Sequence, residues 1–170
     1  MRLRPFKPQD IDCLMKWIPD NERDFTMWSA DRISYPPTRE SLSEYYASYV
    51  ADDNAWFMTA LSDLGVPVGC LLMRKADYKS DSIHFGFIIV DRRLKIRGLG
   101  KEMLSLAIKY AFEILNVKRV TLGVFAINER ALGCYKSVGM REEQYHTGEF
   151  EYKDEKWDLI DMAIGEELHT

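Results

Sequence analysis

The stretch K-I-R-G-L-G-K at residues 95–101 joins an apolar segment to a long amphipathic one, and this order indicates a strand followed by a helix. Residues 83–90 before it predict a buried strand, and the apolar spacing over residues 98–115 predicts a helix. Gly98 and Gly100 lack a Cβ, so the backbone can approach a ligand closely there. A helix that begins at this point presents unpaired N–H groups and the positive end of its dipole. That arrangement binds phosphate.

The charge pattern indicates an anion site at the same place. Residues 91–119 carry 8 basic and 3 acidic residues, a local net charge of +5, in a chain whose net charge is −4. Lys95 and Lys101 flank the two glycines and add a Coulombic contribution. An acidic protein with one short basic segment is a poor general binder of nucleic acid. We therefore expect one compact polyanion as ligand and no nucleic-acid partner.

Spacing excludes two common phosphate-binding motifs. A P-loop needs glycine at position 95 and Ser or Thr at position 102, where this chain has Lys95 and Glu102. A dinucleotide-binding fingerprint needs a third glycine at position 103, which is Met103.

The pattern along the rest of the chain predicts a mixed α/β fold in one domain, residues 1–170. The expected order is a strand, two helices, three strands, a helix, a strand, a helix and a hairpin. The expected strands are residues 1–7, 55–61, 68–74, 83–90 and 119–125, the helices 9–18, 38–50, 98–115 and 128–139, and the hairpin 145–164.

Composition excludes several other classes of protein. Hydrophobic residues make up 46% and charged residues 29% of 170 residues, as in an ordinary soluble globular domain. No apolar run approaches the roughly 18 residues of a membrane span, and the start lacks a secretory signal. The three widely spaced cysteines, Cys13, Cys70 and Cys134, indicate neither a disulfide framework nor a zinc site. We expect a cytoplasmic protein with no membrane partner and no metal.

A second motif, N-E-R-A-L-G-C-Y-K-S-V-G-M at residues 128–140, follows the loop by about 30 residues. With the loop, it resembles the GNAT family of acyl-CoA N-acyltransferases. Their loop reads [Gln/Arg]-x-x-Gly-x-[Gly/Ala], and a later segment reads Asn-x-x-Ala-x-x-x-Tyr-x-x-x-Gly-Phe. Lys95 and Met140 depart from this pattern. The chain is most similar to the branch of ribosomal-protein N-terminal and spermidine acetyltransferases.

The resemblance implies a three-layer α+β fold, a strongly twisted, mostly antiparallel sheet of about seven strands flanked by about four helices. It also implies acetyl-CoA as co-substrate and no metal. Tyr135 is then the general acid, because a phenol of pKa about 10 can protonate a leaving thiolate whose conjugate acid lies near 8.5. The implied cofactor-binding residues are Ile88, Ile89 and Val90 for the pantetheine arm, Lys95, Ile96, Arg97, Gly98, Leu99, Gly100 and Lys101 for the pyrophosphate, and Asn128 and Tyr135.

The same resemblance points to His84 as the general base. Many family members place a glutamate 14 residues before the first loop glycine, and that position here is His84. An imidazole of pKa about 6.5 is suited to the role, and strand alternation predicts that it shares a face with Gly86, Ile88 and Val90. The family's second position for a base is Gly123, which cannot act as one. A strand histidine without a catalytic task, or an enzyme that relies on ordered water, stays open.

The resemblance implies an amine as acceptor. Acidic and aromatic residues occupy the regions that wall the acceptor site in the family, and they would favour a cationic amine. For most of them, packing in the core or a place on the solvated surface is the simpler interpretation. A small molecule (a polyamine or an antibiotic-like amine) and a protein N-terminus both stay open. The different-class alternative is a non-catalytic acyl-CoA-binding or sensing domain, and the family resemblance also admits a homodimer. The acidic and aromatic residues in the acceptor-site regions are Asp20, Glu22, Asp24, Phe25, Trp28, Tyr35, Tyr45, Tyr46, Trp56, Glu149, Tyr152 and Trp157.

Overall fold

A computed structural model describes residues 1–167, so the last three residues of the expected domain lie outside the described part. Seven strands form one sheet in the order β1-β2-β3-β4-β5-β7-β6. Every neighbouring pair is antiparallel except β4 with β5. The strands are β1 Arg2–Pro5, β2 Trp56–Leu61, β3 Pro67–Asp77, β4 Ser82–Val90, β5 Arg119–Phe125, β6 Arg141–Tyr152 and β7 Glu155–Gly165.

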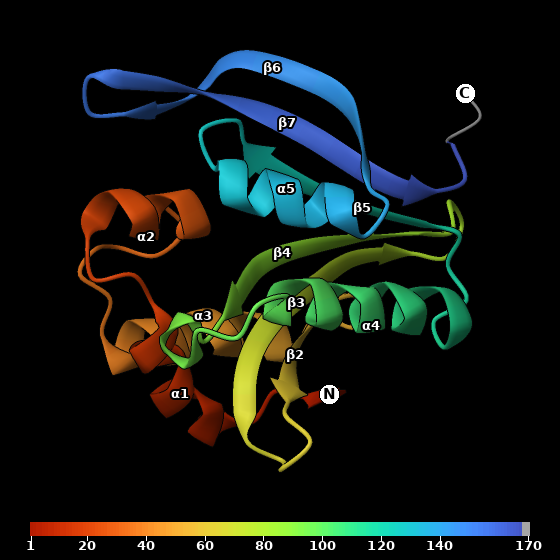
Figure 1. Cartoon of the computed structure of the whole chain (residues 1–170), viewed down its shortest axis with the longest axis horizontal. Coiled ribbons are helices and arrows are strands. Elements are labelled where there is room, and N and C mark those ends of the chain that lie inside the picture. The colour runs from red at the N-terminus through yellow and green to blue at the C-terminus, as the bar shows by residue number, and fades with distance from the viewer. Residues whose placement is uncertain (168–170) are drawn as a thin grey trace.

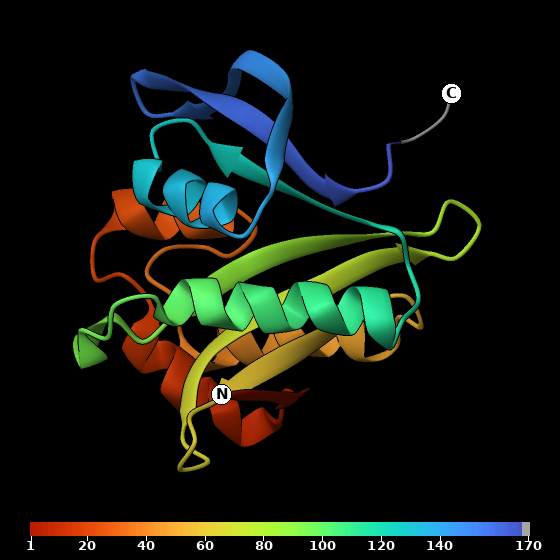
Figure 2. The same cartoon turned by 45° about the vertical axis from the view of Figure 1, so that its right-hand side comes forward.

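Two layers of helix cover the two faces of the sheet, as Figures 1 and 2 show. On one face, α4 and α5 pack against the larger hydrophobic cluster, which includes Leu71, Phe85 and Leu122. On the other face, a second cluster joins the sheet to α1, α2 and α3. The helices are α1 Ile11–Trp17, α2 Glu22–Ser29, α3 Arg39–Val50, α4 Leu99–Glu113 and α5 Glu129–Ser137, with short 3-10 turns at Pro8–Asp10 and Arg92–Leu94. None of the helices in residues 1–167 is long and apolar enough to cross a membrane.

The expected fold class is confirmed, with one helix more than expected. Helix α2 was not predicted from the sequence, although Asn21 caps it by accepting a hydrogen bond from the Asp24 N–H at 2.9 Å. The helix has only 8 residues, so its apolar repeat is too short to stand out. Four of its residues, Asp24, Met27, Trp28 and Ser29, line the cavity described below.

The sheet opens between its two parallel strands. β4 and β5 pair only from Ser82 to His84 and from Arg119 to Thr121. Beyond these residues β5 pairs along its length with β7, and β4 continues beside β3. The two strands diverge toward the side where α2 and the start of α5 lie (Figure 1). The edge of β4 after His84 therefore keeps backbone N–H and C=O groups that no strand in residues 1–167 uses.

A β-bulge in β4 changes which side chains face each layer. Between the pairs Cys70↔Ile89 and Leu72↔Gly86, β4 has one residue more than β3, and Phe87 has a φ of +48°. Phe85 packs in the α4 cluster, whereas Phe87 and Ile89 pack in the α1–α3 cluster. The predicted alternation is therefore wrong beyond Gly86, because Ile88 and Val90 pack against the α4 side.

Candidate active site

One cavity of about 1420 Å³ occupies the gap between β4 and β5. Elements far apart in the sequence line this cavity. They include α2, β4, the loop at residues 95–101 (the glycine loop), α5 and β7. The structure brings every site residue expected from the sequence to this one cavity. They are His84, Ile88, Ile89, Val90, Lys95, Ile96, Arg97, Gly98, Leu99, Gly100, Lys101, Asn128 and Tyr135.

The glycine loop is shaped to admit a ligand against its backbone. Gly98 is the N-cap of α4 with a φ of +79°, a conformation that favours glycine. A Cβ built at Gly98 would meet nothing within 4 Å, so the space in front of the loop is open. The first intrahelical bond of α4 runs from the Glu102 N–H to the Gly98 carbonyl, which leaves the preceding N–H groups of the first turn for a ligand.

Two cations that the sequence reasoning missed also line the cavity. Arg92 lies in the turn before the loop, and Arg130 lies in the first turn of α5. Burial, and then the nearby charge of Arg130, lower the pKa of Arg92. Two like charges held close together over a cavity favour an anion between them. Arg92 belongs to the basic segment noted above, and Arg130 lies inside the 128–140 motif, so both could have been proposed.

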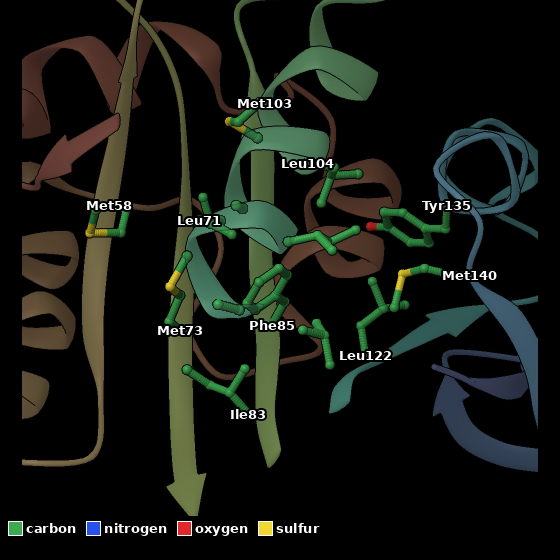
Figure 3. Close-up of a cluster of buried hydrophobic side chains, with 14 of the residues drawn as sticks. Met58, Leu71, Met73, Ile83, Phe85, Met103, Leu104, Leu122, Tyr135 and Met140 are labelled. Carbon is green, nitrogen blue, oxygen red and sulfur yellow. The ribbon is translucent and has the colours of Figure 1, made fainter. Parts of the chain in front are cut away.

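Tyr135 is buried at the wall of the cavity. Its ring packs in the larger hydrophobic cluster, and in Figure 3 its hydroxyl points away from α5 toward Leu104 of α4. Burial, and then the neighbouring Cys134, raise the pKa of Tyr135 above its ordinary value. The phenol therefore stays protonated at neutral pH, as a proton donor must.

Cys134 and Asn128 have structural contacts of their own. A Cβ at Gly100 would lie 3.4 Å from Cys134 Sγ, so this thiol packs where α5 meets α4. Burial raises the pKa of Cys134 and disfavours the thiolate that a nucleophile needs. Asn128 caps α5 by accepting a hydrogen bond from the Ala131 N–H at 3.2 Å, and it also lines the cavity.

His84 is half-buried at the point where the two strands separate. Its Nδ1 lies 2.9 Å from Thr121 Oγ1 across the β4–β5 pair. Burial, followed by the charges of Arg74, Lys75 and Arg32, lowers the pKa of His84 to about 4. The imidazole is therefore neutral at pH 7, but it is a weaker base than its ordinary pKa of about 6.5 led us to expect.

The pKa values of the two histidines near the cavity should be shifted in opposite directions from the ordinary value. In a pH titration followed by NMR of the imidazole protons, His84 is expected to show a midpoint of about 4. His146 should titrate above 6.5, because Asp161 accepts a hydrogen bond from its ring and raises its pKa. His84→Ala assigns the first signal. A midpoint for His84 near 6.5 would contradict the placement of Arg74, Lys75 and Arg32 around it.

The acidic and aromatic residues expected at the acceptor site divide between the cavity and other tasks. Asp24, Trp28 and Glu149 line the cavity. Glu22 instead pairs with Lys153 at 2.8 Å, and Trp157 is buried in an aromatic cluster. Basic residues beside these acidic and aromatic ones were not predicted from the sequence. Arg32, Arg74 and Lys75 line the same cavity.

A sheet split between two parallel strands, with a glycine-capped helix and a buried tyrosine at the split, defines an acyl-CoA-dependent acyltransferase. The chain belongs to the acetyltransferase (GNAT) family, whose model, described as an acetyltransferase (GNAT) domain, matches residues 1–141. Membership defines the reaction as acetyl transfer from acetyl-CoA to an amine nitrogen. The sequence-based assignment to this family is confirmed.

Similar proteins carry related names. The chain is 22% identical over 143 residues to the SPbeta prophage-derived uncharacterized N-acetyltransferase YokL of Bacillus subtilis, covering 84% of this chain and 77% of that protein. It is 29% identical over 80 residues to a probable spermine N(1)-acetyltransferase of Bacillus subtilis subsp. natto, 47% of this chain and 50% of that one.

Solved structures of similar shape include spermidine N-acetyltransferase from Vibrio cholerae in complex with CoA and spermine. It superposes with a TM-score of 0.82 at 21% identity, covering 96% of this chain and 94% of that one. At this identity the likeness establishes the fold.

Proposed function

We propose that this chain, as a single domain, catalyses the acetyl-CoA-dependent N-acetylation of a primary amine carried by a small molecule. The observation that carries the proposal is the cavity itself, which joins the glycine loop, the free edge of β4, Tyr135 and the side chains of α2. A non-catalytic acyl-CoA sensor would need the loop but not a buried, protonated phenol in the same cavity.

The residues present fit acetyl-CoA. The open loop before α4, together with Lys95, Arg97 and Lys101, suits a pyrophosphate, and the edge of β4 at Ile88–Val90 suits the amides of a pantetheine arm. Arg92 and Arg130 would add positive charge beside it. When bound, acetyl-CoA supplies the acetyl group as a thioester.

The chain contributes proton control and positioning. Tyr135 would donate its hydroxyl proton to the departing sulfur as the C–S bond breaks, and the proton that the nitrogen loses as the C–N bond forms would pass through water and restore the phenol. His84, neutral at pH 7 and fixed by Thr121, would accept a hydrogen bond from the incoming amine or from a water beside it. Backbone N–H groups on the free edge of β4 would stabilise negative charge on the acetyl oxygen.

The test is thiol release from acetyl-CoA with a panel of primary amines, including spermidine and spermine because similar proteins bear those names. Acetylation of at least one small amine, with the product identified by mass spectrometry, supports the proposal. Saturable binding of acetyl-CoA with no amine accepted would support the sensor instead. Absence of binding near 1 mM would contradict both.

Charge at the loop should set the affinity for acetyl-CoA. Lys101→Glu is expected to weaken binding about fivefold, because roughly 1 kcal/mol of helix-terminus electrostatics is lost. Lys109→Glu, on the same helix but paired with Glu113, is the matched control and should leave binding unchanged. Calorimetric titration at low and raised salt measures both. Equal effects of the two substitutions would show that the loop does not bind the phosphates.

A further inference from the structure

Arg74 is a buried cation that lines the cavity and has no ion-pair partner within residues 1–167. It extends from β3, is 9% exposed, and lies over Gly86, where a Cβ would be 3.7 Å from its Nε. The Nε–H has no hydrogen-bond partner within residues 1–167, and none of the ion pairs formed by these residues includes Arg74. A buried guanidinium without a partner costs free energy unless a bound ligand accepts its hydrogen bonds and offsets its charge.

Other unsatisfied donors line the same cavity. Trp28 Nε1 and Ser29 Oγ are also buried without a partner in the described part of the chain, and both residues line the cavity. The Trp28 ring stands edge-on to Phe87 at 5.1 Å, and the Arg32 guanidinium lies 6.0 Å from the same ring. Phe87 directly follows Gly86, so these groups gather around the β4 bulge. They share one property, which is that each can donate a hydrogen bond.

Five acidic residues line the cavity, Asp24, Asp91, Glu129, Glu149 and Asp161, and none of them forms an ion pair with Arg74 within residues 1–167. Asp161 lies 2.7 Å from His146 Nε2, and Glu149 also raises the pKa of that imidazole. The local charge around Arg74 therefore stays positive, with Arg32 and Lys75 on the same cavity. These positive charges would repel a polycationic acceptor, whereas an anionic group on the acceptor would be attracted to them.

We propose that the acceptor amine carries an anionic group, a carboxylate, which binds Arg74 beside the β4 bulge. The enzyme then acetylates molecules of the amino-acid type in preference to polyamines. This inference rests on the proposed function, since it names the acceptor class of the same site. Arg74 acts as a specificity-determining residue, and Trp28 and Arg32 complete the subsite.

The first test needs only the wild-type protein and matched acceptors. γ-Aminobutyrate, butylamine and diaminopropane share an amine on three methylenes and end in a carboxylate, a methyl and an ammonium, respectively. We expect kcat/KM by thiol release to be roughly tenfold to a hundredfold higher for the carboxylate. Glycine and β-alanine vary the spacing, and taurine and phosphoethanolamine distinguish a carboxylate from a sulfonate or phosphate.

Variants assign the preference to Arg74. Arg74→Met should lower kcat/KM for the preferred amino acid by roughly tenfold to a hundredfold, mainly through KM, whereas butylamine, which has no carboxylate, should not show this rise in KM. Arg74→Lys should recover part of the loss, since it keeps the charge but not the planar fork. Lys79→Met, at the exposed turn of the same hairpin, is the control and should behave as wild type.

A binding readout avoids turnover altogether. Butyrate, a carboxylate without an amine, should raise the NMR titration midpoint of His84 in the wild type, because its charge offsets the cations around that ring. The shift should be lost in Arg74→Met. Preference for diaminopropane or butylamine over γ-aminobutyrate would overturn the inference and leave the proposed function intact. Failure to acetylate any amine would overturn the proposed function itself.

Discussion

Tyr135→Phe is expected to lower kcat by about a hundredfold or more, with the KM for acetyl-CoA changed by less than about twofold. Phenylalanine keeps the ring that packs in the hydrophobic cluster and removes only the hydroxyl. The departing thiolate then loses its proton donor, while the loop and β4 edge that would bind acetyl-CoA stay as they are. Steady-state thiol release with a saturating acceptor measures the loss.

Tyr46→Phe is the matched control for this substitution. Tyr46 lies on α3, and its hydroxyl donates a hydrogen bond to the Phe6 carbonyl at 3.2 Å. Tyr46 does not line the cavity. It should cost about 1 kcal/mol of stability and no turnover. Full turnover in Tyr135→Phe would remove the phenol from the mechanism. Because burial raises the pKa of Tyr135, wild-type kcat should also not fall through loss of this proton as the pH approaches 10.

The parts of the site that follow from local sequence were predicted well. The glycines of residues 95–101 and the apolar repeat after them place a helix start, and the structure has α4 beginning at Leu99. Asn128 is a helix cap in both the sequence pattern and the structure. Each of these features depends on residues within a few positions of one another, so periodicity and capping preferences suffice.

The parts that depend on long-range packing were not predictable in the same way. The β4 bulge holds Phe87, and not the preceding Gly86, at a φ of +48°, and it reverses the side-chain alternation that follows. The pKa of His84 is lowered by burial and by charges from β3 and from the segment after α2, which meet only in the folded chain. In the sequence Arg74 is the polar end of an apolar strand, and only packing shows that it is buried and that its Nε–H has no partner within residues 1–167.

Asp10→Ala is expected to destabilise the fold by about 3–5 kcal/mol, the cost of leaving a buried charged network without one partner. Asp10 is 2% exposed and accepts hydrogen bonds from Arg4 at 2.6 and 2.9 Å, from the Lys7 N–H at 2.9 Å and from Thr59 Oγ1 at 2.8 Å. It thereby joins β1, the first turn and β2. Urea unfolding measures the change, and Asp12→Ala, an exposed carboxylate that pairs with Arg39, should cost less than about 1 kcal/mol.

The pH dependence of this difference follows from the pKa of Asp10. Burial alone would raise that pKa, but the hydrogen bonds from Arg4, Lys7 and Thr59 lower it below the ordinary value. A carboxylate with a lowered folded-state pKa contributes its full stability above the unfolded pKa of about 4 and loses it as the pH falls through the folded value. The gap in unfolding free energy between wild type and Asp10→Ala should therefore be constant from pH 6 to 8 and shrink below about pH 4. A gap that widens on acidification would mean that Asp10 is held in its protonated form, and the network with Arg4 would have to be redrawn.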